Sequence, residues 1–328
     1  MRKFLIRRLL LCILILFLVS IIIYTIMRCL PTSYIESLAR ERSMLPGAKS
    51  YQECLAQLEA VYNLDKHPII GFFGWLSKAI TGDFGDSWVF NVPVTEKFKD
   101  VIWDSFWLSL ISLILELVIS IPLGILAARK QYSKTDYSIT VFALIGISLP
   151  SFFFATILKL VFSSNLGWFE SVGKYGRYFD QLPPFEQFLD IASHFVLPIA
   201  TLTIVSIGFL MRYTRTNMLE VLNSDYIRTA RAKGLSEKVV INKHAFRNTL
   251  IPIVTIVGGT LPGLFSGAMI TEQLFALPGI GYTSYVALIK GDIPFSMFYL
   301  LFMAILTLLG TLMADILYAV VDPRVRVN

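Results

Sequence analysis

The sequence has few charged residues, few cysteines and few histidines, and each scarcity excludes a class of protein. Only 16% of its 328 residues are charged while 55% are hydrophobic, which is far from a soluble globular domain and close to a polytopic membrane protein. The nucleotide-binding pattern G-x-x-x-x-G-K-[ST] is absent, so the chain is not expected to hydrolyse ATP by that machinery. No motif that reads RNA or DNA accompanies the net charge of +6, and a nucleic-acid partner is not expected.

The three histidines and three cysteines do not form the spacing of a metal site. His67, His194 and His244 are far apart and fall in different predicted compartments, so no metal is expected. Cys29 and Cys54 would lie on the same side of the membrane, which leaves two alternatives: a disulfide between them or, as we favour, two free thiols.

Long apolar runs are abundant, and a helix needs roughly 20 apolar residues to cross a bilayer. Six runs qualify: 9–27, 106–128, 138–162, 191–211, 250–270 and 295–321. Pro150 and Pro262 interrupt the third and fifth, and neighbouring helices or water must then satisfy the freed backbone groups. The sequence thus predicts an all-α polytopic protein with six transmembrane helices.

The chain has no Pro-rich or Ser-rich linker, which favours one membrane domain, residues 1–328. Within it, residues 1–27 form a retained first transmembrane helix, because the apolar run is too long for a signal peptide and no cleavage site follows. Residues 28–105 form an extracytoplasmic region, predicted to be helical at the membrane surface. Residues 106–321 form a five-helix core with a polar loop at 212–249.

Basic residues concentrate in the N-terminus, in 129–137, in 212–249 and in the C-terminal tail, while the opposite loops hold most of the acidic residues. The positive-inside rule therefore places both termini in the cytoplasm, with the lipid bilayer as the surroundings of the chain.

The stretch 224–252 is the most polar run between two apolar segments. Ser224 or Asp225 is a suitable N-cap for a short helix over 225–233, and Gly234 is a suitable C-cap. Ser236 would begin a second helix toward Pro252. A solvated basic connection is the alternative to a functional loop.

Specific residues of this loop resemble the "EAA" loop of ATP-binding-cassette importer permeases. Ala230 and Gly234 match that motif, whereas Arg228 and Thr229 stand where the family has Glu and Ala. YIRTARAKGL followed by HAFRNTLIP is typical of the B-type permease subunit in the oligopeptide, dipeptide and nickel branch. The resemblance extends, in order, through residues 62–88, the stretch 272–281 and the terminal DPR at 322–324.

The resemblance implies a type I importer permease in a bacterial-type plasma membrane. It would be a non-catalytic subunit without cofactors, forming half of a peptide pathway, with nickel chelates or oligosaccharides as alternative substrates. Its partners would be a second homologous permease, two ATPase subunits that carry ATP and Mg, and an extracytoplasmic substrate-binding protein. A proton-coupled secondary transporter or a channel is the alternative class, although no inverted repeat supports it.

Within the loop, the resemblance assigns coupling to the ATPase to residues 226–234. Arg228, Arg231 and Lys233 would contact the ATPase beside Tyr226. Ala230 and Gly234 would permit close docking and the turn.

Some residues inside the apolar runs are also candidates for function. Gly259, Gly263 and Gly267 have a four-residue spacing, which predicts one helix face that packs either within the subunit or against the second permease. Glu116 and Asp315 are intramembrane carboxyl groups. A hydrogen-bonded structural pair, in this bundle or with a partner, is favoured over a proton relay. Lys159 is expected to snorkel to the outer interface.

Overall fold

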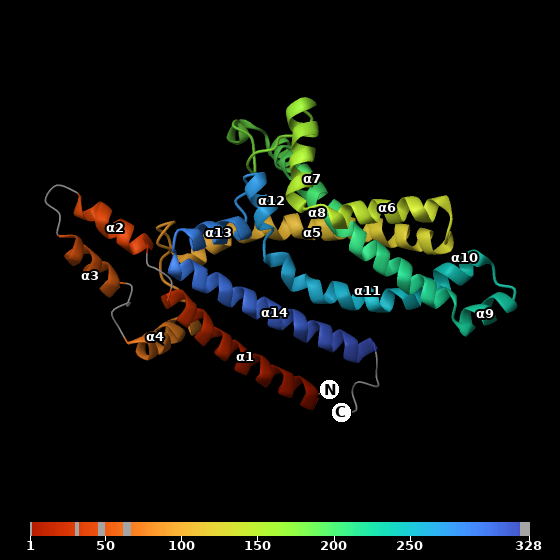
Figure 1. Ribbon diagram of the computed structural model, residues 1–328, viewed down its shortest axis with the longest axis horizontal. Coiled ribbons are helices and arrows are strands. Elements are labelled where there is room, and N and C mark those ends of the chain that lie inside the picture. Colours follow the sequence, from red (N-terminus) through yellow and green to blue (C-terminus); the bar gives the residue numbers. More distant parts are fainter. Residues whose placement is uncertain (1, 30–32, 45–49, 62–66, 322–328) are drawn as a thin grey trace. The chain divides into compact units, whose positions relative to one another are not determined.

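The computed structural model describes residues 2–29, 33–44, 50–61 and 67–321. Within these ranges all regular elements are helices, apart from an isolated bridge between Asp86 and Pro93 (Figure 1). They are α1 (Arg2–Cys29), α2 (Ser33–Ser43), α3 (Tyr51–Val61), α4 (Pro68–Ile80), α5 (Val94–Arg129), α6 (Lys134–Ser148), α7 (Ser151–Leu158), η1 (Lys159–Asn165), η2 (Phe179–Gln181), α8 (Pro184–Leu222), α9 (Asp225–Ala232), α10 (Glu237–Val239), η3 (Val240–Ala245), α11 (Phe246–Thr260), η4 (Leu261–Phe265), α12 (Met269–Leu274), α13 (Ile280–Ile289) and α14 (Ile293–Val321). The resembling stretches at 62–66 and 322–324 lie outside the described residues.

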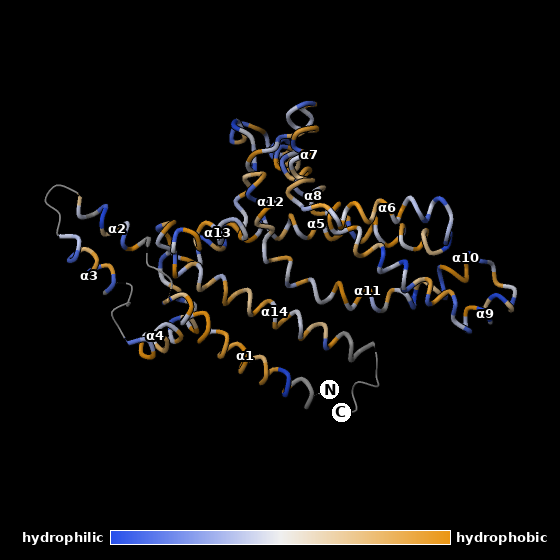
Figure 2. The backbone as a smooth tube through the Cα atoms, viewed as in Figure 1, coloured by the Kyte–Doolittle hydropathy of each residue, from blue (hydrophilic) through white to orange (hydrophobic). Residues whose placement is uncertain are grey.

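Four helices are long and apolar enough to cross a membrane. They contain the spans Ile6–Cys29, Val94–Arg129, Pro184–Leu222 and Ile293–Ile316. Two bent pairs bring the number to six if each counts as one span: Lys134–Ser148 with Ser151–Asn165, and Glu237–Leu250 with Pro252–Phe265. The all-α, polytopic fold predicted from the apolar runs is confirmed. Figure 2 shows α1 hydrophobic along most of its length and α9 largely hydrophilic.

The predicted break at Pro150 is real and much sharper than a kink. The two helices on either side of it meet at 103°. Leu149 adopts an extended conformation with ψ 138°, because the ring of a following proline disfavours the helical region. The third apolar run is therefore two helices, α6 and α7, rather than one rod.

The helices also extend beyond the apolar runs that predicted them. The run 106–128 is only the apolar part of α5, which begins at Val94, and the run 191–211 is the middle of α8. Polar residues continue both helices past the apolar stretch, so hydropathy finds the span and misses the helix ends. The expected extracytoplasmic helices are α2, α3 and α4, and the last residues of 28–105 belong to α5.

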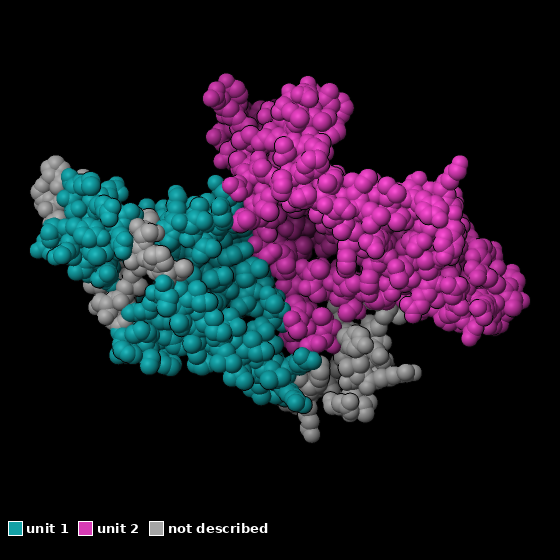
Figure 3. All heavy atoms as spheres, in the orientation of Figure 1, with its two compact units in different colours: residues 1–103, 280–309 teal, residues 104–279, 310–328 magenta. Residues whose placement is uncertain are grey.

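Two compact units make up the chain: residues 1–103 with 280–309, and residues 104–279 with 310–328 (Figure 3). Helices α5 and α14 contribute residues to both. The expected single membrane domain, residues 1–328, stays a prediction.

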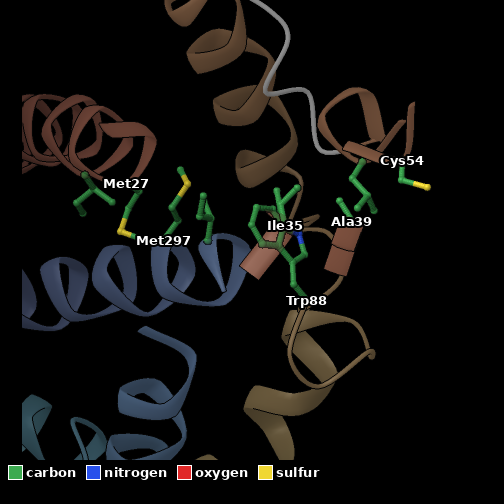
Figure 4. Packing of buried hydrophobic residues seen from close by; sticks show 9 residues of the cluster. Met27, Ile35, Ala39, Cys54, Trp88 and Met297 are labelled. Carbon is green, nitrogen blue, oxygen red and sulfur yellow. The ribbon is translucent and has the colours of Figure 1, made fainter. Parts of the chain in front are cut away.

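The first unit has a core made by residues from α1, α2, α3 and α14. Met27 of α1 and Met297 of α14 lie side by side in it, and Ile35 and Trp88 are buried in the same cluster (Figure 4). Cys54 is buried there too, whereas Cys29 is exposed, and no disulfide joins them.

A buried carboxylate fixes the start of α14 in this unit. Asp292 is fully buried and accepts hydrogen bonds from the Ser87 hydroxyl and from the backbone N–H groups of Val89 and Phe295, each of these two at 3.1 Å. The bond from Phe295 caps the helix, and the other two anchor the turn that precedes α5.

In the second unit α6, α7, α11 and α12 pack against α8. Glycines permit close approaches between these helices: a Cβ atom at Gly146 would lie 2.8 Å from the carbonyl oxygen of Ile204. The snorkelling of Lys159 to the outer interface stays a prediction. Its half-buried ammonium donates to the carbonyl oxygen of Leu274 at 3.0 Å, where the positive charge satisfies the C-terminal end of α12.

Candidate functional site

The candidate site is the basic elbow, residues 224–249, which joins α8 to α11 in the second unit. Ser224 has the extended backbone of an N-cap, although its side chain donates to the carbonyl oxygen of Val221 instead of capping α9. Asp225 places a negative charge in the first turn of α9, where the helix dipole favours it. Gly234 ends α9 with φ 76°, a left-handed conformation that glycine adopts without a Cβ penalty. The helix and turn predicted for 225–234 are confirmed.

The second helix of the elbow is less regular than predicted. Ser236 has the extended N-cap conformation, and α10 begins at Glu237. After Val239 the backbone continues as the π-helix η3 and then as α11. The predicted helix toward Pro252 thus forms in three segments.

One face of α9 packs against the chain's own helices. Ile227 and Ala230, three residues apart, are 0% and 6% exposed and join a core cluster with Met218 of α8 and Val240 and Ile241 of η3. Fully burying an isoleucine side chain is worth about 1.5–3 kcal/mol, so this contact holds α9 against α8 and η3.

The burial of Ala230 shows a structural role in this chain. Its side chain faces the core, and the expectation that it permits close docking of an ATPase stays a prediction. Ala230 lies where η3 packs against α9. A residue that matches a docking motif can therefore also be buried in its own chain, and the packing of the structure shows that it is.

The opposite face of α9 is exposed and basic. Around the rest of the helix, Tyr226, Arg228 and Arg231 are exposed, and so is Lys233 at the C-cap. The hydroxyl of Tyr226 accepts a hydrogen bond from the Asn248 side chain at 3.1 Å, which connects α9 to α11.

Two of these cations have acidic neighbours in the chain. Arg231 donates two hydrogen bonds to Glu237, at 2.8 and 3.1 Å, across the Gly234 turn. These bonds raise the pKa of Arg231 above its ordinary value, so its guanidinium stays cationic. Arg228 lies 3.5 Å from Asp225, and both side chains are largely exposed, so this pair adds little stability. Lys233 makes no ion pair with any described residue.

A second ion pair, which sequence reasoning missed, connects α8 to α6 beside the elbow. Arg215 donates two hydrogen bonds of 2.7 Å to Asp136, whose side chain is 4% exposed. Asp136 also accepts the backbone N–H of Tyr132 at 3.0 Å. A bidentate, largely buried pair of this kind fixes orientation as well as distance.

One signal for Asp136 was present in the sequence. Ser133 caps α6 by accepting the N–H of Asp136, and a serine followed three residues later by an acidic residue marks a helix start. Nothing in the sequence pairs Asp136 with Arg215, because they are 79 residues apart.

The three glycines do not share a helix face, so that prediction is wrong. Gly259 is in α11, Gly263 is in η4, and Gly267 follows with φ 80°. Helix α11 ends before Pro262, which has no N–H to continue it. Gly259 serves packing within the chain, since a Cβ atom at Gly310 of α14 would lie 3.1 Å from its carbonyl oxygen. Contact of the other two with a second permease stays a prediction.

The two intramembrane carboxyl groups lie on α5 and α14, and both are half-buried. Glu116 makes no hydrogen bond or ion pair within the described part of the chain. The favoured pairing of Glu116 inside the bundle is therefore not formed here, and its pairing with a partner subunit stays a prediction, as does the role of Asp315.

Membrane-length helices and two bent helix pairs define a polytopic helical membrane protein. The family of binding-protein-dependent transport system inner membrane components matches residues 120–327. The chain belongs to this family, and it is a multi-pass permease subunit of a transport system.

Full-length relatives agree with the family. The oligopeptide transport system permease protein AppB of Bacillus subtilis is 39% identical over 99% of this chain and 100% of its own length. The oligopeptide permease OppB of Haemophilus influenzae is 33% identical over 99% and 100%, and the dipeptide permease DppB of Alkalihalophilus pseudofirmus is 32% identical over 98% of each chain.

A solved structure shows the same fold. The inward-facing MetNI methionine ABC transporter matches with a TM-score of 0.53 and 18% identity, over 70% of this chain and 97% of that chain. At this identity the likeness concerns the fold alone.

Proposed function

We propose that the chain forms half of the translocation pathway of an ATP-driven peptide importer. The basic elbow would transmit the conformational change of the ATPase subunits to this chain. The observation that carries the proposal is the two-sided nature of α9. Its inner face is buried in the chain's own core through Ile227 and Ala230, and its outer face is exposed and basic. Such a helix can transmit a displacement by a bound partner directly to α8 and, through η3, to α11.

The contacts around α9 suggest how movement of the elbow would reach the membrane-length helices. Ile227 and Ala230 rest on η3, which continues into α11, and on Met218 of α8. From α8 the bidentate pair of Arg215 with Asp136 leads to α6. Closure of the ATPase pair on ATP would move these helices together and shift the bundle between two access states.

The remaining parts of the proposal follow from the family and the charges. Both termini would be cytoplasmic, because the basic loops cluster with them. A second homologous permease would complete the pathway, and an extracytoplasmic binding protein would deliver the substrate. ATP and Mg would be bound by two ATPase subunits, and this chain would need no cofactor. Peptide is the proposed substrate because relatives that align along the full length are named for oligopeptide and dipeptide transport.

The proposal is tested by purifying the tagged chain from its host membrane in mild detergent and measuring ATP hydrolysis in the eluate. We expect two ATPases and a second permease to co-purify, with hydrolysis stimulated by the binding protein and peptide. A chain that elutes alone without hydrolysis would refute the importer. Stimulation by a nickel chelate or an oligosaccharide, but not by peptide, would refute the substrate and retain the importer.

A further inference from the structure

Helix α4 (Pro68–Ile80) is too short to cross a membrane yet is almost entirely apolar. It has 13 residues, PIIGFFGWLSKAI, of which Lys78 alone is charged. At a rise of about 1.5 Å per residue the helix is roughly 20 Å long, whereas the apolar core of a bilayer is about 30 Å thick. The apolar side chains of such a helix must be shielded from water on more than one side.

One side of α4 is covered by α1 in the first unit. The ring of Phe72 packs edge-to-face against Tyr24 and Phe17, with centroids 5.6 and 6.0 Å apart. Trp75 lies 6.1 Å from Tyr24. Gly71 makes the closest approach, since a Cβ atom there would clash with the Tyr24 hydroxyl and lie 2.9 Å from the Arg28 guanidinium.

These contacts fix the depth of α4 along the span. The membrane-length run of α1 ends at Cys29, and Phe17 is twelve residues, about 18 Å, from that end. Arg28 donates to the hydroxyl of Tyr24 at 2.8 Å, the pattern of a basic and an aromatic side chain at the edge of a bilayer. Phe72 therefore lies deeper than this edge, at the level of the apolar part of α1.

The opposite side of α4 is apolar and uncovered. Ile69, Ile70, Phe73 and Ile80 are 61%, 64%, 56% and 78% exposed. In an α-helix these positions fall within an arc of about 100°. The arc points away from Gly71, Phe72 and Trp75, which face α1.

We infer that α4 is embedded in the edge of the bilayer beside α1, with lipid acyl chains covering the face formed by Ile69, Ile70, Phe73 and Ile80. Lipid is the expected partner of this face because α4 lies at the level of the apolar part of α1. At the level of Phe72, α1 itself exposes apolar side chains such as Ile21 and Ile22, and the membrane-length run of α1 is only 11% buried. The uncovered face of α4 continues this lipid-facing surface.

The test places the photo-crosslinking amino acid benzoylphenylalanine at single positions of the full-length chain, in the complex in which it resides in its host membrane. The test positions are Phe73 and Ile80. Ile22, an exposed residue of the α1 span, is the positive control, and Gln57, an exposed residue of α3, is the negative control. After irradiation, mass spectrometry identifies lipid adducts, and gel mobility identifies protein adducts.

We expect lipid adducts at Phe73 and Ile80 at yields within about threefold of that at Ile22, and yields at least tenfold lower at Gln57. Crosslinks from Phe73 and Ile80 to another subunit would overturn the inference in favour of a protein-covered face. Yields at both positions as low as that at Gln57 would overturn it in favour of an aqueous face. Because both positions are exposed, the probe replaces no core residue, and protein yield checks folding.

Discussion

At the scale of single residues, Gly234 is where backbone conformation and proposed docking meet. A Cβ atom there would contact nothing within 4 Å, but φ is 76°. A side chain at this position would therefore fit without a clash. It would destabilise the fold only through the left-handed backbone conformation, by about 1–2 kcal/mol for most residues.

We predict that Gly234→Glu leaves the complex assembled but abolishes peptide uptake, because it puts a negative side chain on the basic face. Gly234→Asn is the matched control, since asparagine tolerates the left-handed region, and it is expected to retain most of the uptake. Uptake of labelled peptide by whole cells measures both. Normal peptide uptake by the Gly234→Glu variant would contradict the assignment of residues 226–234 to ATPase coupling.

The pair of Asp136 with Arg215 gives a second prediction at this scale. Asp136→Asn removes charge-assisted hydrogen bonds, which are worth about 1.5–3 kcal/mol, and is expected to lower the stability of the purified subunit by that order. Arg215→Lys keeps the charge but loses the planar fork, so an intermediate loss is expected.

Thermal unfolding in detergent, followed by fluorescence, measures both losses. The double variant is expected to be no worse than Asp136→Asn alone, because the two residues act on one contact. Additive losses would show that they act separately.

At the scale of elements, α9 combines a buried stripe and an exposed one within eight residues. We predict that Arg228→Glu combined with Lys233→Glu reduces co-purification of the ATPases at least tenfold, since both cations are exposed. The change spares Ile227 and Ala230, so the elbow itself stays folded.

Lys130→Glu is the control for this prediction, because it reverses an exposed positive charge in the loop before α6. It is expected to leave co-purification unchanged. An equal loss in the control would indicate a general charge effect rather than docking at α9.

The elements also show what the sequence could predict. The apolar runs located each membrane-length helix, Pro150 marked the bend between α6 and α7, and Gly234 marked the turn after α9, because these effects act through local chemistry. Pro262 marked the end of α11, whereas the bend of the second pair lies at residue 251, before Pro252. The direction in which Ala230 faces depends on η3, and the failure of the glycine face depends on α11 ending before Pro262. The contact between Asp136 and Arg215 depends on how α6 crosses α8. Such facts arise from packing between distant segments, which periodicity does not encode.

At the scale of the whole molecule, the charge distribution predicts orientation. A fluorescent protein fused after Asn328 is expected to fluoresce, since it folds in the cytoplasm. Alkaline phosphatase fused after Gln57 of α3 is expected to be active, since it needs an oxidising compartment. Exchanging the two reporters between the sites is the control and is expected to silence both. Activity of the phosphatase at the C-terminus would invert the topology.

The sharp bend at Pro150 has a consequence for hydration. Proline has no N–H, so the carbonyl of Gly146 loses the donor that an unbroken helix would supply, and the first amides of α7 begin a new helix in the midst of an apolar run. Polar backbone in that setting persists only where protein or water reaches it. The bend therefore places polar backbone groups within this span, which neighbouring helices or water must satisfy.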